Sequence, residues 1–364
     1  MKILYDHQMF SLQRYGGITK YFCEIISNIP PDHQFELSVL FSDNYHLHEK
    51  YKLFGKKNIL PKKNFRRKEV LQKMIYNINQ YYSKYRISAN HFDLFHPTFY
   101  NDYFFKVLKR PYIITVHDLI EFKFKDASYQ SDSIRPYMEK TIKSANRIIA
   151  ISENTKKDII DIFGIDSAKI DVIYHGYNRR GLKTSENKFG KYILFVGNRS
   201  RYKNFKIFAE AISSLLKKER DVKLICVGPP FKSEEMSHLK TLNILENSIA
   251  INVDEPALNN LYSNAMVFVY PSLYEGFGMP ILEAFANNCP VCLSQTSSFP
   301  EIAGNAGVYF DPSSPDSILA AIEKIIYNKD FAFDIVKAGQ ARLMNFSWKK
   351  AAEETILSYQ RTIS

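Results

Sequence analysis

Cysteine, tryptophan and long apolar runs are all scarce in this chain. Its 364 residues include four cysteines and one tryptophan, which excludes a small secreted scaffold held together by disulfides. No apolar run reaches the roughly 20 residues that a helix needs to cross a membrane. The opening stretch MKILYDHQMF lacks the long apolar core of a signal peptide. We therefore expect a cytoplasmic protein without a transmembrane helix.

Two of the cysteines, Cys289 and Cys292, form a CxxC pattern inside NCPVCLS. A redox pair is one interpretation of that spacing. The flanking residues instead favour a buried strand, in which free cysteine behaves as a small hydrophobic residue. We expect two reduced thiols with a structural role.

Two common motifs for holding phosphates are missing as well. The chain has neither a Walker pattern, GxxxxGK[ST], nor an Asp-x-Asp, the usual site for a metal that carries a sugar-nucleotide diphosphate. We therefore expect no metal site and no cofactor. If a diphosphate binds, cations of the chain itself must hold it.

Positive charge is concentrated in the first half of the chain. Residues 1–180 carry 29 Lys and Arg against 19 Asp and Glu, whereas residues 181–364 carry 20 against 19. Residues 50–73 alone hold ten basic residues and one acidic residue, Glu69. Such a cluster predicts a polyanionic partner, or else a charged loop that is simply solvated. Because no recognised nucleic-acid motif is present, we favour anionic lipid or a phosphorylated acceptor over nucleic acid.

Strand-like and helix-like segments alternate along the chain, which predicts an α/β fold with parallel sheets. KILYD, YIITVHD and RIIAIS are strand-like runs of the first half, and YILFVGN, VKLICVGPP and VFVYPS restart the pattern in the second. The polar stretch at residues 178–190 has no apolar periodicity and predicts a linker. We expect two doubly wound, Rossmann-like domains facing across a cleft, at residues 1–180 and 181–345. Ligands of such sheets bind beyond the carboxyl ends of the strands.

Three candidate sites follow predicted strands. Gly16 and Gly17 precede a helix whose free N–H groups suit a phosphate, although a Gly-Gly turn without a ligand is the alternative. His117, in VHDL, could hydrogen-bond a ligand hydroxyl or could be a structural histidine. Fixed cations between a strand and a helix suit a diphosphate. The stretch GNRSRYKN supplies three, namely Arg199, Arg201 and Lys203.

The stretch YEGFGMPILEAF, residues 274–285, carries a fourth and more specific pattern. Glu275 lies before a turn made by Gly276 and Gly278, and Pro280 fits the first position of the helix that follows. Glu283 is then expected in the first turn of that helix. The two carboxylates straddle a bend, so they could bind two parts of one long ligand, with a phosphate between them at the helix N-terminus. Complementing the helix dipole would explain Glu283 alone.

PSLYEGFGMPILEAFANNCPV resembles the signature of the retaining glycosyltransferases of family 4, which have the GT-B fold and share the pattern E-G-F-G-x-P-x-x-E-A. YGGITKYF, TVHDLI, FVGNRSRYKN and FSWKKAAEETI are similar to further blocks of the family, in the family's order. The resemblance covers essentially the whole chain. It implies that a C-terminal helix, residues 346–364, crosses back to the first domain. It also implies hexose transfer from a nucleotide sugar with retention at the anomeric carbon.

The resemblance assigns roles to residues at the matching positions. Glu275, His117 and Lys203 would form the catalytic centre, with Glu275 on hydroxyls of the donor sugar and Lys203 on the diphosphate. The donor-binding residues would be Gly16, Gly17, Arg199, Arg201, Lys203, Gly276, Phe277, Gly278, Met279 and Glu283, the last on the nucleotide ribose. Tyr202 stands where the family often has an arginine, so Arg199 and Arg201 are alternatives for a second cation. Because Glu275 and Lys203 are expected away from core faces, their replacement by alanine should abolish transfer and leave the fold intact.

The motifs look most like those of bacterial mannosyltransferases of surface-polysaccharide synthesis. GDP-mannose is therefore the favoured donor and UDP-hexose the second, with a glycan or a lipid-diphosphate-linked glycan as acceptor. A sugar-nucleotide epimerase or a phosphorylase of the same fold is the alternative class. A lipid-linked acceptor, together with the basic first half, predicts a peripheral location on the cytoplasmic face of the inner membrane. Residues 69–84 could lie at that interface, although Ile75 and Ile78 are expected to pack on the sheet.

Overall fold

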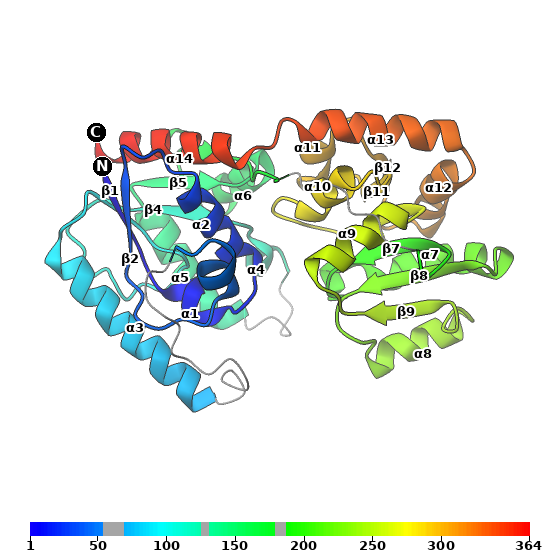
Figure 1. Ribbon diagram of the computed structural model, residues 1–364, viewed down its shortest axis with the longest axis horizontal. Helices are drawn as coiled ribbons and strands as arrows, with labels where there is room; N and C mark the ends of the chain where they lie inside the picture. Colours follow the sequence, from blue (N-terminus) through cyan, green and yellow to red (C-terminus); the bar gives the residue numbers. More distant parts are fainter. Residues whose placement is uncertain (54–68, 125–130, 179–186) are drawn as a thin grey trace. The chain divides into compact units, whose positions relative to one another are not determined.

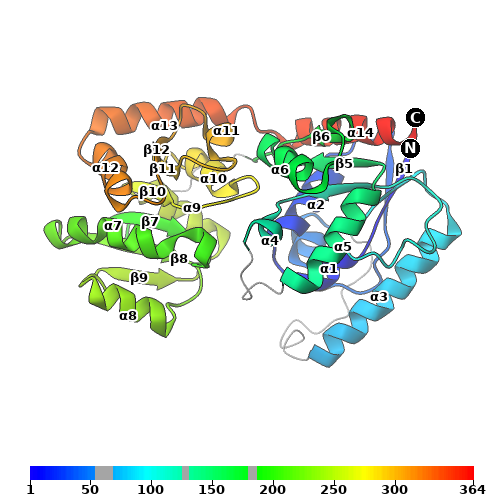
Figure 2. The same cartoon turned by 180° about the vertical axis from the view of Figure 1, so that it is seen from behind.

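The chain folds into two compact units (Figures 1 and 2). The computed structural model describes residues 1–53, 69–124, 131–178 and 187–364. The first unit comprises Met1–Gly176 and Ser347–Ser364, and the second comprises Tyr177–Phe346. Most of the basic stretch at residues 50–73 and of the predicted linker at residues 178–190 lies outside the described residues.

Parallel strands form the centre of the first unit. β1 lies between β2 and β3, β5 lies between β4 and β6, and a bridge from Phe95 to Tyr112 joins β3 to β4. The elements are β1 (Lys2–Tyr5), α1 (Gln8–Leu12), α2 (Gly17–Ser27), β2 (Gln34–Leu37), η1 (His46–Lys50), α3 (Glu69–Ala89), β3 (Leu94–His96), β4 (Ile113–Val116), α4 (Ile120–Lys123), α5 (Ser131–Ser144), β5 (Arg147–Ala150), α6 (Glu153–Phe163), η4 (Ser167–Lys169), β6 (Ile170–Val172) and α14 (Trp348–Ile363).

Side chains of β1 alternate between two hydrophobic clusters, which is why helices cover both faces of this sheet. Ile3 and Tyr5 pack with residues of α2 and α14, whereas Leu4 packs with residues of α3 and α5. The last helix of the chain, α14, therefore completes the core of the first unit. Asp171 of β6 fixes its C-terminal end by accepting hydrogen bonds from Ser358 (2.6 Å) and Arg361 (2.6 Å).

The second unit contains one parallel sheet in the order β12-β11-β10-β7-β8-β9. Its elements are β7 (Lys191–Val196), η5 (Arg201–Lys203), α7 (Phe205–Lys218), β8 (Val222–Val227), α8 (Ser233–Thr241), β9 (Ser248–Ile251), α9 (Glu255–Asn264), β10 (Val267–Tyr270), α10 (Met279–Ala286), β11 (Val291–Ser294), α11 (Phe299–Ala303), β12 (Val308–Phe310), α12 (Pro315–Ile326) and α13 (Lys329–Leu343). The three residues of β12 have no counterpart among the predicted strands, because so short a run shows no periodicity.

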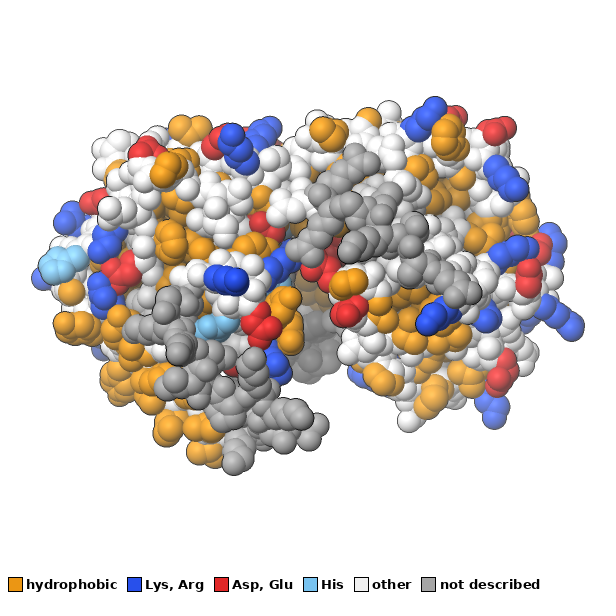
Figure 3. All heavy atoms as spheres, in the orientation of Figure 1, with side chains coloured by type: hydrophobic (Ala, Val, Ile, Leu, Met, Phe, Trp, Pro, Cys, Tyr) orange, Lys and Arg blue, Asp and Glu red, His pale blue; other side chains and the backbone are white. Residues whose placement is uncertain are grey.

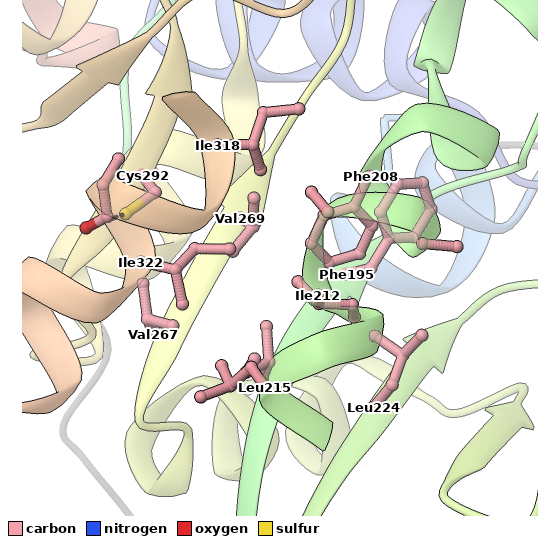
Figure 4. Close-up of a cluster of buried hydrophobic side chains, with 14 of the residues drawn as sticks. Phe195, Phe208, Ile212, Leu215, Leu224, Val267, Val269, Cys292, Ile318 and Ile322 are labelled. Atoms are coloured by element: carbon pink, nitrogen blue, oxygen red, sulfur yellow. Dashed lines mark hydrogen bonds between the residues drawn. The ribbon is translucent and has the colours of Figure 1, made fainter. Parts of the chain in front are cut away.

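A core of interdigitated apolar side chains covers one face of this sheet (Figure 4). Apolar residues of α7 recur at helical spacing, so Phe208, Ile212 and Leu215 all point to the strands. Cys292 lies in the same core, and both cysteines of the CxxC pattern are buried free thiols. Burial raises the pKa of each thiol, which keeps it protonated and supports the structural interpretation.

The strand order creates a switch point between β7 and β10. The chain leaves β7 towards β8 on one side and leaves β10 towards β11 on the other. Loops that follow the two strands therefore diverge at the carboxyl edge, which is where ligands of open parallel sheets bind. The predicted stretches GNRSRYKN and YEGFGMPILEAF follow β7 and β10, respectively.

Four buried histidines distinguish the first unit. Burial lowers the pKa of His7, His96 and His117 to about 3 and that of His175 well below its ordinary value. His96 lies between Tyr359 (Nδ1 to hydroxyl, 2.7 Å) and Thr115 (Nε2 to hydroxyl, 3.1 Å). The four imidazoles are therefore neutral in the folded protein.

We predict that acid unfolds the first unit selectively. Unfolding lets each buried histidine return to its ordinary pKa near 6.5, so the unfolded state binds more protons below that pH. Each histidine with a pKa of about 3 then removes about 1.4 kcal/mol of folding stability per pH unit below about 6.5. The fluorescence of Trp348, the single tryptophan, reports unfolding of this unit.

The measurement is thermal unfolding of Trp348 fluorescence between about pH 7 and pH 5. A His238→Gln variant is the control, because His238 is the single histidine of residues 177–346 and should not change the pH dependence. A melting temperature that stays constant over this range would contradict the prediction.

Candidate active site

The turn after β7 brings Lys203 to the carboxyl edge of the second sheet. Gly197 and Gly228, which end β7 and β8, have positive φ angles of 127° and 154°. A Cβ on Gly228 would lie 2.5 Å from the carbonyl oxygen of Gly197, so only glycine allows these two turns to approach each other. The short helix η5 then ends at Lys203, and Asn204 follows in the left-handed region before α7 begins.

Arg199 is committed to holding this turn together. Its side chain is 2% exposed and forms an ion pair with Glu235, with Nε 3.0 Å from Oε1. Its Nη2 also donates to the carbonyl oxygens of Pro229 (2.7 Å) and Pro230 (2.9 Å). Arg201, in contrast, is exposed. The two arginines therefore differ in exposure, since Arg199 is built into the turn and Arg201 lies at the surface.

Two serines that the sequence analysis did not select fix the loop after β10. The backbone N–H of Glu275 donates to the hydroxyl of Ser297 (3.0 Å), which donates in turn to the carbonyl of Glu275 (2.6 Å). Ser298 donates to the carbonyls of Glu275 (3.0 Å) and Phe277 (2.9 Å). The sequence carries no distinct indication of these serines, because contacts across more than 20 residues leave no local periodicity.

Lys203 and Glu275 form an ion pair where the two loops meet. Lys203 Nζ lies 2.5 Å from Glu275 Oε1 and 3.4 Å from the hydroxyl of Tyr270. Each residue is 9% exposed, so both are buried although they lie on the turn after β7 and the loop after β10 and not on a strand or helix face of the core. Both are placed by strand ends at the switch point, where backbone from neighbouring loops covers them. Burial and the charge of Glu275 hold the pKa of Tyr270 well above its ordinary value, so its hydroxyl stays neutral.

Glu283 lies on α10, which begins at Met279 after the positive φ of Gly278. It is therefore the fifth helical residue, and the expectation that it falls in the first turn is wrong. The helix starts one residue earlier than expected because Met279, and not Pro280, takes the first position. Glu283 Oε2 accepts a hydrogen bond from the hydroxyl of Tyr262 (3.2 Å), which orients the carboxylate.

The first unit contributes a separate group of candidate residues. Gly16 is the N-cap of α2 and Gly17 is its first residue, and the two differ in their surroundings. A Cβ on Gly16 would lie 1.8 Å from Gln13 Oε1, whereas a Cβ on Gly17 would have no neighbour within 4 Å. A side chain at the first position would therefore have to displace the flexible end of Gln13, whereas the second glycine leaves open space at the N-terminus of α2.

His117 follows β4 and lies against α2. Its ring contacts Tyr21 edge-to-face at 5.0 Å between centroids and His175 at 5.9 Å. Its Nε2 is buried and has no hydrogen-bond partner among the described residues. A neutral imidazole here could serve as a hydrogen-bond partner for a ligand. In the described part of the chain, no three His, Cys, Asp or Glu residues gather as metal ligands would.

Parallel doubly wound sheets with charged residues at a switch point define a nucleotide-binding class of α/β protein. Comparison with known families refines this. Residues 15–180 match the model described as Glycosyltransferase Family 4, and residues 182–342 match the model described as Glycosyl transferases group 1. Together the two models span nearly all of the sequence. The chain belongs to the family 4 glycosyltransferases and has the GT-B fold.

Individual relatives and structures agree with this assignment. The O-antigen chain mannosyltransferase RfbU of Salmonella typhimurium is 29% identical over 60% of this chain, and the match spans 62% of that relative's length, less than two thirds. O-antigen chain mannosyltransferase B of Escherichia coli is 29% identical over 68% of this chain and 70% of its own. Anabaena HepE in complex with UDP-glucose superposes with a TM-score of 0.74 at 16% identity, covering 99% of this chain and 100% of HepE. That likeness concerns the fold alone.

We predict that Glu275→Gln and Lys203→Gln each lose nearly all transfer activity and also destabilise the second unit. Removing one member of a buried ion pair leaves the other charge without its partner, at a cost of about 3–5 kcal/mol. The double variant should recover most of that stability, because no unpaired charge remains, but it should stay inactive. Thermal unfolding and a transfer assay measure the two effects.

The matched control is Glu234→Gln, which removes an exposed carboxylate from the same unit and should change neither quantity. Turnover at the wild-type rate by either single variant would remove both residues from the active site.

Proposed function

We propose that the protein transfers a hexose from a nucleotide sugar to a glycan acceptor, with GDP-mannose as the favoured donor. The observation that carries this proposal is the buried Lys203–Glu275 pair at the switch point of the second sheet. A diphosphate needs a cation at that point, and a sugar needs hydrogen-bond acceptors for its hydroxyls. The pair supplies one of each, 2.5 Å apart.

The donor would replace the partner that each residue has in this structure. Its diphosphate would bind Lys203 and, as a second cation, Arg201. Its sugar hydroxyls would donate hydrogen bonds to Glu275. Glu283, on the far side of the α10 N-terminus, would bind the ribose. Backbone N–H groups at Gly278 and Met279 would face the phosphate, as the positive end of the α10 dipole favours.

In the reaction, the bond between the anomeric carbon and the diphosphate oxygen breaks and a bond to the acceptor oxygen forms. Lys203 stabilises the negative charge that develops on the leaving diphosphate, as a preorganised electrostatic contact. The acceptor hydroxyl gives its proton to that leaving phosphate. The same-face attack that this implies retains the configuration at the anomeric carbon. No metal takes part in this scheme, since fixed cations of the chain hold the diphosphate.

The relatives support the proposed donor sugar and acceptor. Both O-antigen relatives are named mannosyltransferases, which supports mannose as the sugar and a surface-polysaccharide glycan as the acceptor. The HepE structure contains UDP-glucose, which keeps UDP-hexose as the second candidate. A sugar-nucleotide epimerase of the same fold differs in one measurable property, since it needs no acceptor.

We predict that GDP raises the melting temperature of the protein more than UDP does, because binding to the native state stabilises it. We also expect GDP-mannose to release GDP only when a mannose-containing acceptor is present, and to do so equally in excess EDTA. Conversion of GDP-mannose into an isomeric nucleotide sugar without acceptor and without net release of GDP would favour the epimerase. Loss of activity in EDTA, restored by magnesium or manganese, would contradict the metal-free diphosphate site.

A lipid-linked acceptor would place the protein at an anionic membrane surface, and α3 supports this location. Among the described residues, no helix is both long and apolar enough to cross a membrane. Hydrophobic side chains nevertheless gather over α3 in the lower left of Figure 3. The exposed ones share one face of the helix: Val70 (84%), Met74 (51%), Tyr81 (73%) and Tyr85 (69%).

The opposite face of α3 is buried and lies against α1, with Ile75 buried and Ile78 half-buried. Residues 50–68, which precede the helix, contain nine basic residues and no acidic one. Each lysine or arginine near an anionic surface contributes about 1 kcal/mol, so this stretch and the aromatic face together favour peripheral binding.

We predict that the protein sediments with vesicles of equimolar phosphatidylcholine and phosphatidylglycerol, and less so as salt increases. Two variants should weaken binding: Tyr81→Ser with Tyr85→Ser, and the replacement by serine of four residues outside the described part, Lys62, Lys63, Arg66 and Arg67. The control is Tyr327→Ser with Phe333→Ser, which removes two exposed rings from the second unit. If the protein does not sediment with these vesicles at low salt, a soluble acceptor becomes the better proposal.

A further inference from the structure

An aromatic pair with one exposed ring lies on the first unit beside the Gly16–Gly17 turn. Tyr15 is 61% exposed, and its ring centroid lies 5.2 Å from that of Tyr45 at an interplanar angle of 35°. The guanidinium carbon of Arg14 lies 5.4 Å from the centroid of the Tyr15 ring. Tyr15 belongs to neither hydrophobic core cluster of this unit. Core packing therefore gives no reason for a large ring at this position.

The segments that carry the two rings are fixed to each other. Three hydrogen bonds join residues 10–14 to residues 42–45: Tyr45 N to Arg14 O (2.9 Å), Asn44 Nδ2 to Gln13 O (2.7 Å) and Ser42 Oγ to Phe10 O (2.7 Å). Tyr45 also contacts the ring of His46 edge-to-face at 5.6 Å. His46 begins the π-helix η1, a rare conformation that occurs frequently at functional sites. Tyr15 is thus an exposed ring on a segment that hydrogen bonds hold in place.

The segment that carries Tyr15 lies at the carboxyl edge of the first sheet, where a ligand is expected. Tyr15 directly precedes the N-terminus of α2, where Gly17 has open space around it. One turn further along α2, Tyr21 contacts His117, which follows the carboxyl end of β4. Tyr15, Gly17 and His117 therefore all lie at the carboxyl edge of the sheet, where doubly wound domains bind ligands.

We propose that Tyr15, backed by Tyr45, forms a stacking subsite for a sugar ring of the acceptor glycan. A pyranose ring has a face of polarised C–H groups, which pack on the electron-rich face of an aromatic ring. Its hydroxyls at the rim can accept hydrogen bonds from the Arg14 guanidinium, which has five N–H donors. The donor's nucleotide would also stack on a ring, but its diphosphate is accounted for by Lys203 in the second unit. This subsite rests on the proposed glycosyl transfer and adds the residues that bind the acceptor.

The test is saturation-transfer NMR of the full chain with methyl α-mannoside, methyl α-glucoside and methyl α-galactoside as probes. We expect transfer to at least one glycoside in the wild type and a loss of about tenfold in affinity in Tyr15→Ala. Tyr15→Phe keeps the ring and should bind as the wild type does. Tyr327→Ala, which removes an exposed ring from the second unit, is the control and should also be unchanged.

The subsite is overturned if no glycoside binds the wild type, or if Tyr15→Ala binds as well as Tyr15→Phe. Folding of each variant is checked through Trp348 fluorescence, which reports this unit. Nucleoside diphosphate binding, followed by thermal shift, should be the same in all variants. A wild type that binds glycosides at Tyr15 but releases no nucleoside diphosphate from any donor would overturn the proposed function and leave the subsite standing.

Discussion

The parallel sheet of the second unit is the constraint on which the candidate active site depends. Because all six strands run in one direction with β7 in the middle, the loops after β7 and β10 start at one edge and diverge. Since β7 and β10 are neighbouring strands, the two loops start side by side and bring Lys203 and Glu275 together, although 72 residues separate them. Other features of the second-unit site hold these loops in place. They include the glycines after β7 and β8 and the two serines that hydrogen-bond the backbone of Glu275.

The ion pair also explains how such a site can be stable without a ligand. A buried lysine and a buried glutamate are each costly alone, and each satisfies the other in this structure. In the proposed reaction a nucleotide sugar would offer both residues a new partner, so that binding would exchange one set of charge-assisted contacts for another. Arg199 shows the opposite arrangement. It binds Glu235 and the carbonyls of Pro229 and Pro230, and these contacts stabilise the turn that presents Lys203.

The first unit is built on a different principle, with neutral polar groups in its core and open rings at its edge. His96, Tyr359 and Tyr5 form a chain of hydrogen bonds under α14, with no net charge. Burial keeps four of its histidines without a proton, which links the folded state of this unit to neutral pH. An edge with an exposed aromatic ring beside an arginine suits a glycan, just as the charged edge of the second unit suits a nucleotide.

The sequence by itself determined the alternation of strands and helices, the two-domain α/β class and the family, because periodicity and motifs are local properties. It also selected Lys203, Glu275 and Glu283, since glycine and proline mark the turns on which they lie. Only the tertiary structure decided which of these residues are paired, how deeply they are buried and where α10 begins. Arg199 and Arg201 are equivalent cations in the sequence, and only contacts with a distant glutamate and two carbonyls distinguish them. Ser297, Tyr15 and β12 had no distinct signal for the same physical reason: their roles depend on contacts with residues far along the chain.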